Sequence, residues 1–556
     1  KHNLNVMAGV NAEEEEYKYL YGTRNVMYDQ EGYPELNMAG KDGQDLSWNH
    51  TSRASAGYFG RINYDYKGIY LLELNGRYDG SSRFPHTDQW AFFPSASIGY
   101  RFSEEAYFAP LKHIVSNGKL RASFGEIGNE AVGDYMFEQL ISQRLNNKST
   151  GYIYWIENNN ANANLLTMYN MPDLVSSTLT WERIRTLNIG LDLGLLNDEL
   201  TIGFDWFQRE NRDMLAPAQV LPNTLGASAP YENAGTLRTR GWELNLNWRH
   251  TFGDFDVYAN FNIGDSKTKV TKWDNDSKLL STYYTGKTYG DIFGFETDRY
   301  FEEKDFTSQN ADGSWNYANG IASQAGLESG NFHYGPGDVK FKDLDGNGKI
   351  DGGKGTADDH GDLKVIGNSM PRYEYSFHLG GAWKGIDLDL YFQGVGKRED
   401  WTTSSLNLPA MVHADVAIYS HQTSYNKVLW NSDYTAITGY EVNQGNRYPR
   451  LYRGTNNSGG TVSGIANGCN NYYPQSRYLT DMSYLRLKNV TVGYTLPKEW
   501  TRKAYIEKAR IYFSGSNLFL LHKGNDLPVD PEISTGNGLT AGGWGRIAPI
   551  TRTFSF

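Results

Sequence analysis

One short stretch of the sequence has the residue types and the spacing of a calcium-binding loop. Its oxygen donors fall at alternate positions and would be the side chains of Asp343, Asp345, Asn347 and Asp351 and the main-chain carbonyl of Lys349. Carboxylate, amide and carbonyl oxygens spaced in this way can converge on one hard cation. Gly348 would permit the sharp turn that such a loop requires.

This stretch departs from a complete EF-hand at its twelfth position. Lys354 stands there in place of the usual bidentate glutamate, and Asp358 or Asp359 could substitute from farther along the chain. A calcium ion in a long loop would order that loop, so its role would be structural. The alternative is a turn rich in aspartate and asparagine that holds no metal.

No motif in the sequence points to catalysis. Gly286, Lys287 and Thr288 look like the end of a phosphate-binding loop, but Ser281 stands where the first glycine belongs. The sequence contains neither a zinc-protease His-Glu pattern nor a Gly-x-Ser-x-Gly elbow, and its spacing singles out no glycosidase pair. We therefore predict no catalytic residues and a protein that is not an enzyme.

Aromatic side chains offer a second kind of candidate site. Trp155, Trp401 and Trp430 fall in stretches that we expect to be loops, where an indole ring could stack on the face of a sugar. The same side chains could instead pack within folded loops or against a partner protein. The sequence does not choose between these roles.

The composition favours a protein built from strands. Aromatic residues make up 14% of the 556 residues and glycine occurs 60 times, whereas hydrophobic residues as a whole reach only 39%. A chain of this length exceeds one ordinary hydrophobic core, which favours a repeat array or one large barrel. The net charge of -11 argues against a nucleic-acid partner. Cys469 is the single cysteine, which excludes an internal disulfide.

The dominant pattern is a period of two in segments of about ten residues, as expected for strands that cross a membrane. In one such segment Leu187, Ile189 and Leu191 alternate with Asn188 and Asp192. The apolar side chains would face lipid and the polar ones an aqueous lumen. The charged residues expected on the lumen side are Arg61, Asp65, Glu73, Arg77, Asp205, Arg209, Glu243 and Arg249. They would contact cargo or a plug, or would form only the solvated inner wall of a wide barrel.

About fourteen strands are expected, and the connections between them alternate between short and long. We predict an all-β fold, a transmembrane antiparallel β-barrel with short periplasmic turns and long extracellular loops. The long loops are expected near residues 11–57, 127–180, 211–239, 266–372, 395–483 and 521–545.

Several stretches resemble the SusC/RagA family of TonB-dependent outer-membrane transporters. In chain order they are Arg77–Phe84, Phe92–Phe102, Asn233–Gly235 leading to Gly241–Leu244, Gly337–Asp343 and Tyr484–Tyr494. The resemblance covers most of the chain, and the order of the stretches makes it specific.

The resemblance implies a 22-stranded barrel in the outer membrane of a Gram-negative bacterium. It also implies an N-terminal plug domain, a TonB box and a SusD-like surface lipoprotein that caps the mouth. We expect the present chain to be the last part of such a barrel, without the plug, because about fourteen strands of the twenty-two are present. No signal peptide opens the sequence, so an exported protein would have been processed or this chain would be part of a longer precursor. Its partners would be the lipoprotein, the plug-bearing portion, the TonB complex through that portion and the membrane lipid.

The expected function is the wall and rim of an importer for a bulky nutrient, an oligosaccharide in preference to a peptide. Two alternatives remain open. One is a complete fourteen-stranded passive channel. The other is a secreted glycan-binding β-protein, such as a propeller or a sandwich.

Overall fold

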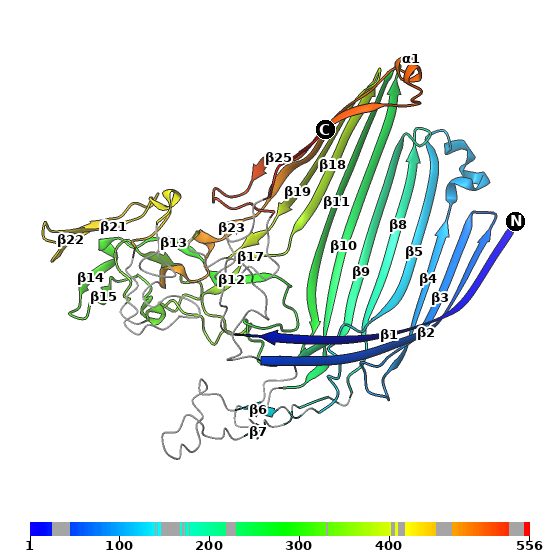
Figure 1. The fold of residues 1–556 in the computed structure, drawn as a ribbon. Helices are drawn as coiled ribbons and strands as arrows, with labels where there is room; N and C mark the ends of the chain where they lie inside the picture. The colour runs from blue at the N-terminus through cyan, green and yellow to red at the C-terminus, as the bar shows by residue number, and fades with distance from the viewer. Residues whose placement is uncertain are drawn as a thin grey trace.

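The computed structural model describes residues 1–24, 45–139, 141, 143–145, 167–169, 172, 174–176, 178–217, 229–329, 332–401, 406–409, 418–451, 470–532 and 550–556. Strands dominate these residues (Figure 1). No helix among them is long enough and apolar enough to cross a membrane.

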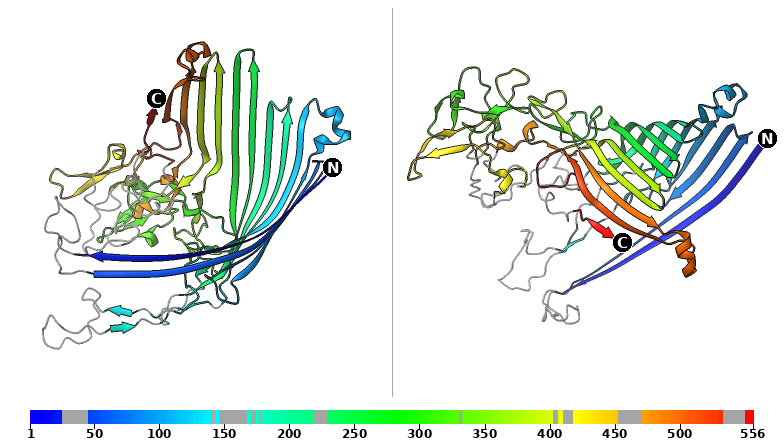
Figure 2. Two further views of the ribbon diagram at one scale, coloured as in Figure 1. Left: turned by 45° about the vertical axis from the view of Figure 1, so that its right-hand side comes forward. Right: turned by 90° about the horizontal axis from the view of Figure 1, so that it is seen from above.

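Fourteen strands form one antiparallel sheet, in which each strand pairs with the next sheet strand along the chain. They are β1 (His2–Thr23), β2 (Asp45–Tyr66), β3 (Tyr70–Ser81), β4 (Trp90–Tyr100), β5 (Val115–Asn129), β8 (Glu182–Leu195), β9 (Leu200–Pro217), β10 (Tyr231–Phe252), β11 (Phe255–Lys272), β18 (Arg372–Trp383), β19 (Ile386–Lys397), β24 (Tyr484–Thr495), β25 (Arg510–Lys523) and β26 (Thr553–Ser555). Seen from above, the sheet is a curved wall that is open on one side (Figure 2). The expected all-β fold and strand number are confirmed.

The connections at one end of the wall are short. Lys67 and Gly68 have φ angles of 57° and 65°, and Lys384 and Gly385 have 48° and 89°. Positive φ at both central residues is the geometry of a two-residue hairpin turn that matches the twist of its strands, which explains the glycines. The longer connections at this end form two 3₁₀ turns after β4 and the helix α1 (Lys498–Thr501) after β24. All the long connections lie at the opposite end.

The outward face of the wall carries large apolar side chains that no other element of the described chain covers. Leu74, Ile189 and Leu388 are 41%, 49% and 43% exposed, although they lie near the middle of their strands. A soluble protein rarely leaves a continuous apolar band of this extent in water. Lipid is the solvent that fits it.

Aromatic side chains mark the two edges of this apolar band. At the loop-bearing end the rings of Tyr58 and Trp90 lie 6.0 Å apart, and at the short-turn end those of Tyr66 and Tyr70 lie 6.3 Å apart. Tyr58 and Tyr66 are separated by eight residues of β2, or about 26 Å along a tilted strand. This agrees with an apolar band flanked by two interfacial aromatic girdles.

The first hairpin differs from the expectation of a loop over residues 11–57. β1 and β2 stay paired without a register shift from His2 opposite Tyr66 to Thr23 opposite Asp45. The acidic run at the middle of β1 has no apolar alternation, but it pairs across the hairpin, since Glu15 bonds to Arg53. Backbone pairing and cross-strand charges therefore extend the strands where hydrophobicity gives no signal.

The two longest connections, 273–371 and 398–483, fold together into what we call the loop body. It contains the small pairs β12 (Asp291–Phe295) with β17 (Leu363–Asn368), β13 (Thr297–Tyr300) with β16 (Val339–Phe341), β14 (Phe306–Gln309) with β15 (Trp315–Tyr317), β20 (Glu399–Asp400) with β23 (Thr480–Asp481) and β21 (Lys427–Trp430) with β22 (Ile437–Glu441). Its buried core is rich in tyrosine and phenylalanine. The loop body hangs at the loop-bearing end of the wall (Figures 1 and 2). A sixth small pair, β6 (Gln143–Leu145) with β7 (Thr167–Tyr169), lies in the β5–β8 connection.

A buried ion pair joins the two connections inside the loop body. Arg450 Nη2 lies 2.6 Å from Asp338 Oδ2, and the Asp338 side chain is fully buried. Asn471 Nδ2 donates to the other oxygen of Asp338 at 2.8 Å, and the main-chain N–H of Gly335 donates to Oδ2 at 2.9 Å. Such a pair fixes the position of both connections because neither charge can be left alone in the core.

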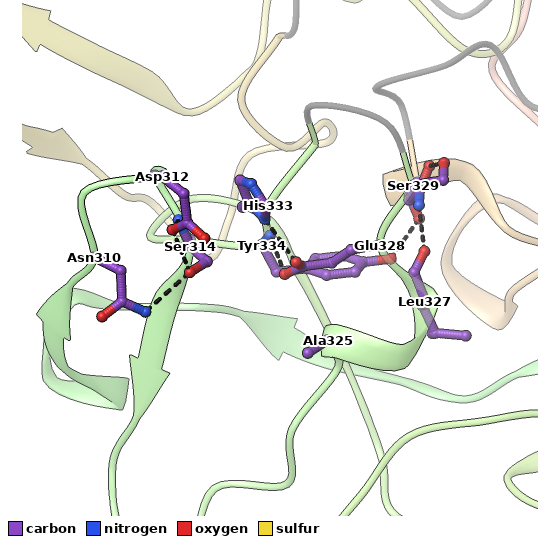
Figure 3. A network of polar contacts seen from close by, with 12 residues as sticks. Asn310, Asp312, Ser314, Ala325, Leu327, Glu328, Ser329, His333 and Tyr334 are labelled. Carbon is purple, nitrogen blue, oxygen red and sulfur yellow. Dashed lines mark hydrogen bonds and ion pairs between the residues drawn. The ribbon is translucent and has the colours of Figure 1, made fainter.

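A second polar network orders the adjoining turn. The carboxylate of Glu328 contacts His333 Nδ1 at 2.7 Å and accepts the main-chain N–H of Tyr334 at 3.0 Å (Figure 3). The hydroxyl of Tyr334 donates to the carbonyl of Asn470 at 2.7 Å. Burial raises the pKa of Tyr334 well above its ordinary value, so this hydroxyl remains a donor.

We expect the buried pair, and not surface pairs, to stabilise the loop body. Arg450→Met should lower its stability by about 3–5 kcal/mol because Asp338 would remain charged and buried. Lys427→Met is the matched control, since its pair with Glu441 is more than half exposed and should contribute at most about 1 kcal/mol. Hydrogen exchange of loop-body amides would measure both effects. Equal protection in the two variants would contradict the assignment.

The orientation of the wall can be tested at two neighbouring residues of β8. Ile189→Lys should destabilise the inserted protein by about 2–4 kcal/mol because the charge would enter lipid near the middle of the band. Asn188→Lys points to the opposite face and should change the stability little. Reversible unfolding in phospholipid vesicles gives both values. A larger effect at Asn188 than at Ile189 would reverse the assigned faces.

Candidate functional site

The inner face of the wall is lined by charges that compensate one another. Arg121 bridges two strands, with its guanidinium nitrogens 3.0 Å from Asp192 and 2.7 Å from Asp205. Arg61 donates to Asn75 at 2.6 Å and lies 3.8 Å from Glu73. These groups are partly exposed, so the inner face is wet as well as charged.

The same arrangement recurs along the wall from β3 to β25. Further inner-face pairs join Arg77 to Asp79 and Asp387 to Arg510. Toward the loop-bearing ends of the strands, ion pairs also join Glu126 to Arg183 and Arg185, Glu210 to Arg212 and Arg238, and Asp265 to Arg372, and these three acidic residues alternate onto the face of Phe124, Trp206 and Ile263. The carboxylate of Asp65 accepts hydrogen bonds from Asn3 Nδ2 at 2.8 Å and from the main-chain N–H of Gly68 at 2.9 Å. The inner face is thus already satisfied by its own partners at most positions.

Three of the predicted lumen charges differ from the rest. Arg209, Glu243 and Arg249 make no ion pair within 4.0 Å to any residue that the structure describes. Among the predicted lumen charges, these three are the ones still open to a cargo or to another part of the protein.

A hollow of about 630 Å³ lies on the inner face, across β1–β5 and β8. Its lining includes the side-chain amides of Asn3 and Asn63 and the charged groups of Glu73, Lys119 and Arg121. A hydrophilic solute or a polar protein segment fits this lining, whereas an apolar ligand does not.

The predicted aromatic candidates occupy different settings. Trp155 lies outside the described residues. Trp401 is partly buried and packs against the core of the loop body, which gives it a structural role. Trp430 ends β21 and is 47% exposed, so its indole remains accessible at the exterior end.

The predicted calcium stretch forms a compact turn held by hydrogen bonds from main-chain N–H groups to side-chain oxygens. Asp343 accepts the main-chain N–H groups of Gly346 at 2.7 Å and Gly348 at 2.9 Å. Asp345 accepts the N–H of Asn347 at 3.0 Å, and Asn347 accepts that of Lys349 at 2.7 Å. Each accepted bond uses one lone pair of a side-chain oxygen and leaves others for a cation.

A carboxylate that we did not single out from the sequence completes the cluster. One oxygen of each of Asp343, Asp345 and Asp362 lies within 4.8 Å of the others. Asp362 is fully buried and accepts the main-chain N–H groups of Leu344 at 2.6 Å and Asp351 at 3.0 Å.

Asp358 and Asp359, the substitutes considered for position twelve, do not join this cluster. Asp358 instead binds Lys278 at 2.9 Å, and Asp359 lies 3.6 Å from Lys354. Asp362 could not be recognised from spacing because the chain makes an excursion of several residues before returning to the loop. Asp351 also stays outside the trio, and its carboxylate accepts the N–H of Gly353 at 2.8 Å.

A charged clamp holds the entrance of this loop. Lys342, which precedes Asp343, and Lys364 on β17 both bind the carboxylate of Glu296. These two hydrogen-bonded ammonium groups lower the pKa of Glu296 to about 2, so the carboxylate is ionised at any physiological pH. The clamp fixes the loop to the strand that follows it.

Comparisons with known proteins agree with this geometry. Residues 2–358 match the family described as TonB dependent receptor-like, beta-barrel. The chain is 27% identical over 96% of its length to "TonB-dependent receptor P3" of Formosa agariphila, of which it covers 48%. It is 25% identical over 87% of its length to "TonB-dependent receptor SusC" of Bacteroides thetaiotaomicron, of which it covers 42%. The chain thus spans about half the length of these relatives.

A solved structure shares the fold. The chain superposes on a chain of the solved "Structure of the RagAB peptide transporter" with a TM-score of 0.68 and 18% identity. The superposition covers 96% of this chain and 51% of the RagAB chain. At this identity the likeness concerns the fold. The family match covers more than half of the chain, and the chain therefore belongs to the TonB-dependent receptor-like β-barrel family of the Gram-negative outer membrane.

Proposed function

We propose that this chain forms the wall and exterior rim of a TonB-dependent importer for a bulky nutrient. The observation that carries the proposal is the two-faced fourteen-stranded wall, apolar toward lipid and polar toward the lumen. The folded loop body adds a rim large enough to meet a bulky solute before it enters. Family membership supports the same function.

The cargo that fits best is an oligosaccharide, in preference to a peptide. The inner wall offers amide, hydroxyl and paired charged groups, which suit a molecule with many hydroxyls. Trp430 and other exposed rings at the exterior end can stack on pyranose faces.

Three further components would complete the importer. A SusD-like lipoprotein would close over the exterior loops, and a plug borne by an N-terminal portion would fill the lumen. The TonB complex would act on that portion to displace the plug. The present chain would then guide the cargo past the plug and would do no chemistry on it.

The rival functions make different demands on the structure. A complete passive channel would need fourteen strands that close on themselves, whereas β1 and β26 are not paired with each other in the described sheet. A secreted glycan-binding protein would leave the apolar band and its aromatic girdles in water, which is unfavourable.

Energy dependence separates the importer from the passive channel. Cells that carry the complete transporter should lose nearly all uptake of a fluorescent oligosaccharide when an uncoupler dissipates the proton-motive force. The matched control is a small solute that enters through general porins, whose uptake should not change. Oligosaccharide uptake that persists in uncoupled cells would favour the passive channel.

We also propose that the loop formed by residues 343–362 holds a structural Ca²⁺. Asp343, Asp345 and Asp362 fit a hard cation by charge and by spacing, with Asn347 and the carbonyl of Lys349 as further oxygen donors. The ion would tie the start of the loop to β17 and would neutralise three adjacent carboxylates.

Removing one carboxylate from the cluster should weaken calcium binding. Asp345→Asn should lower the affinity by at least about tenfold, because the ligand charge falls. It should also make the loop sensitive to protease in the presence of calcium. Asp358→Asn is the control, since that carboxylate binds Lys278 outside the cluster. Titration calorimetry measures the calcium affinity of each variant, and limited proteolysis measures the protease sensitivity of its loop. Wild-type proteolysis that a chelator leaves unchanged would contradict a structural ion.

A further inference from the structure

The first hairpin reaches far beyond the membrane-spanning part of the wall. β1 and β2 have 22 residues each, whereas β3 and β4 have 12 and 11. Beyond the girdle at Tyr58 the hairpin continues for more than ten residues, which corresponds to roughly 35 Å at the rise of a strand. It bends across the open side of the wall at the loop-bearing end (Figures 1 and 2).

Three tyrosines follow one another along the outer part of β1. Tyr17, Tyr19 and Tyr21 alternate along the strand and therefore share one face, which we call the tyrosine strip. The rings of Tyr17 and Tyr19 lie 6.4 Å apart and within 7° of parallel, and those of Tyr19 and Tyr21 lie 6.2 Å apart and within 14°. The strip is thus an aligned row of aromatic rings.

The tyrosine strip is exposed, and its hydroxyl groups have no hydrogen-bond partner among the described residues. The three residues are 53%, 45% and 48% exposed. Their hydroxyls make no hydrogen bond to the described part of the chain, whereas the buried hydroxyls of Tyr300 and Tyr334 in the loop body donate to main-chain carbonyls. Among the described residues, the strip therefore lacks the hydrogen-bond partners that Tyr300 and Tyr334 have.

The partners of the tyrosine strip across the hairpin are uncharged. Across the hairpin the strip pairs with Thr51, Asn49 and Ser47, whose side chains are all uncharged. Glu16 and Lys18 alternate onto the opposite face, whereas Glu13, Glu15 and Arg53 share the face of the strip below Tyr17, where Arg53 donates to Glu15. A ligand on the strip would meet rings, hydroxyls and an amide.

The strip also lies on the face that continues into the lumen. The pairing of β1 with β2 has no bulge, so odd-numbered residues of β1 keep one face along the whole strand. Asn3 and Asn5, which line the hollow of the inner wall, are on that face. A molecule held on the strip would already be aligned with the pathway below it.

We propose that the tyrosine strip is a binding site for a neutral oligosaccharide, which stacks its pyranose rings on the tyrosines. A sugar ring presents an apolar C–H face and a rim of hydroxyls, and the strip presents aromatic rings beside amide and hydroxyl groups. The proposal rests on the importer function and adds the site at which the cargo is first bound.

Calorimetry on the complete transporter tests the site. The probes are maltohexaose, mannohexaose, xylohexaose and an uncharged hexapeptide. Tyr19→Ala should weaken binding of the preferred hexaose about threefold to tenfold, and replacing all three tyrosines by alanine should weaken it further. Tyr19→Phe should bind nearly as the wild type because the ring remains. Trp48→Ala, an exposed residue on the opposite face of the hairpin, is the matched control and should bind unchanged.

The outcomes separate this site from the function on which it rests. Wild-type affinity in the triple variant, with its barrel shown to be folded by heat-modifiable migration, would overturn the site while energised uptake still supports the importer. Loss of hexapeptide binding without loss of hexaose binding would overturn the ligand class. A wild-type protein that binds none of the hexaoses would also overturn it, and a lack of energised uptake of any probe would count against the importer itself.

Discussion

Backbone hydrogen bonding is the constraint on which the rest of this structure depends. In hydrocarbon, every N–H and C=O group must find its partner inside the protein, and a continuous antiparallel sheet satisfies them strand by strand. Once the strands are paired, side chains must alternate between two solvents. Leu388 then faces lipid while Asp387 and Asp389, its neighbours on the same strand, bind Arg510 and His378 on the inner face. Apart from a small buried cluster around Phe93 and Trp181, the wall has little core of its own, because lipid and water solvate its two faces.

As a consequence, the larger hydrophobic core of this chain lies in the loop body and not in the wall. The loop body behaves as a small soluble domain, with a tyrosine-rich centre and the buried pair of Asp338 and Arg450. Some of its tyrosines donate their hydroxyls to main-chain carbonyls, as Tyr334 does to Asn470. A rim built in this way holds its shape, so the exterior mouth can present fixed surfaces to a solute.

Sequence reasoning succeeded where the signal is local. Alternation located the spanning strands, as at Ile189, and Lys-Gly pairs located the tight turns at Lys67 and Lys384. It failed where pairing or tertiary contact decides. The hairpin beyond Gly57 continues through an acidic run without periodicity, and Asp362 reaches the calcium loop only because the chain folds back. A rule based on residue spacing cannot predict that Asp362 returns to the calcium loop.

The two surfaces that a cargo would meet differ in how strongly they can bind. On the inner wall most charges already bond to one another, as Arg121 does to two aspartates, so a passing neutral solute displaces little and gains little. On the hairpin the three tyrosine hydroxyls have no hydrogen-bond partner among the described residues, so a stacked ring would add contact without displacing one. Passage requires binding that is firm at the entrance and weak along the path. In the proposed importer, exposed rings at the mouth and compensated charges in the lumen would provide that order.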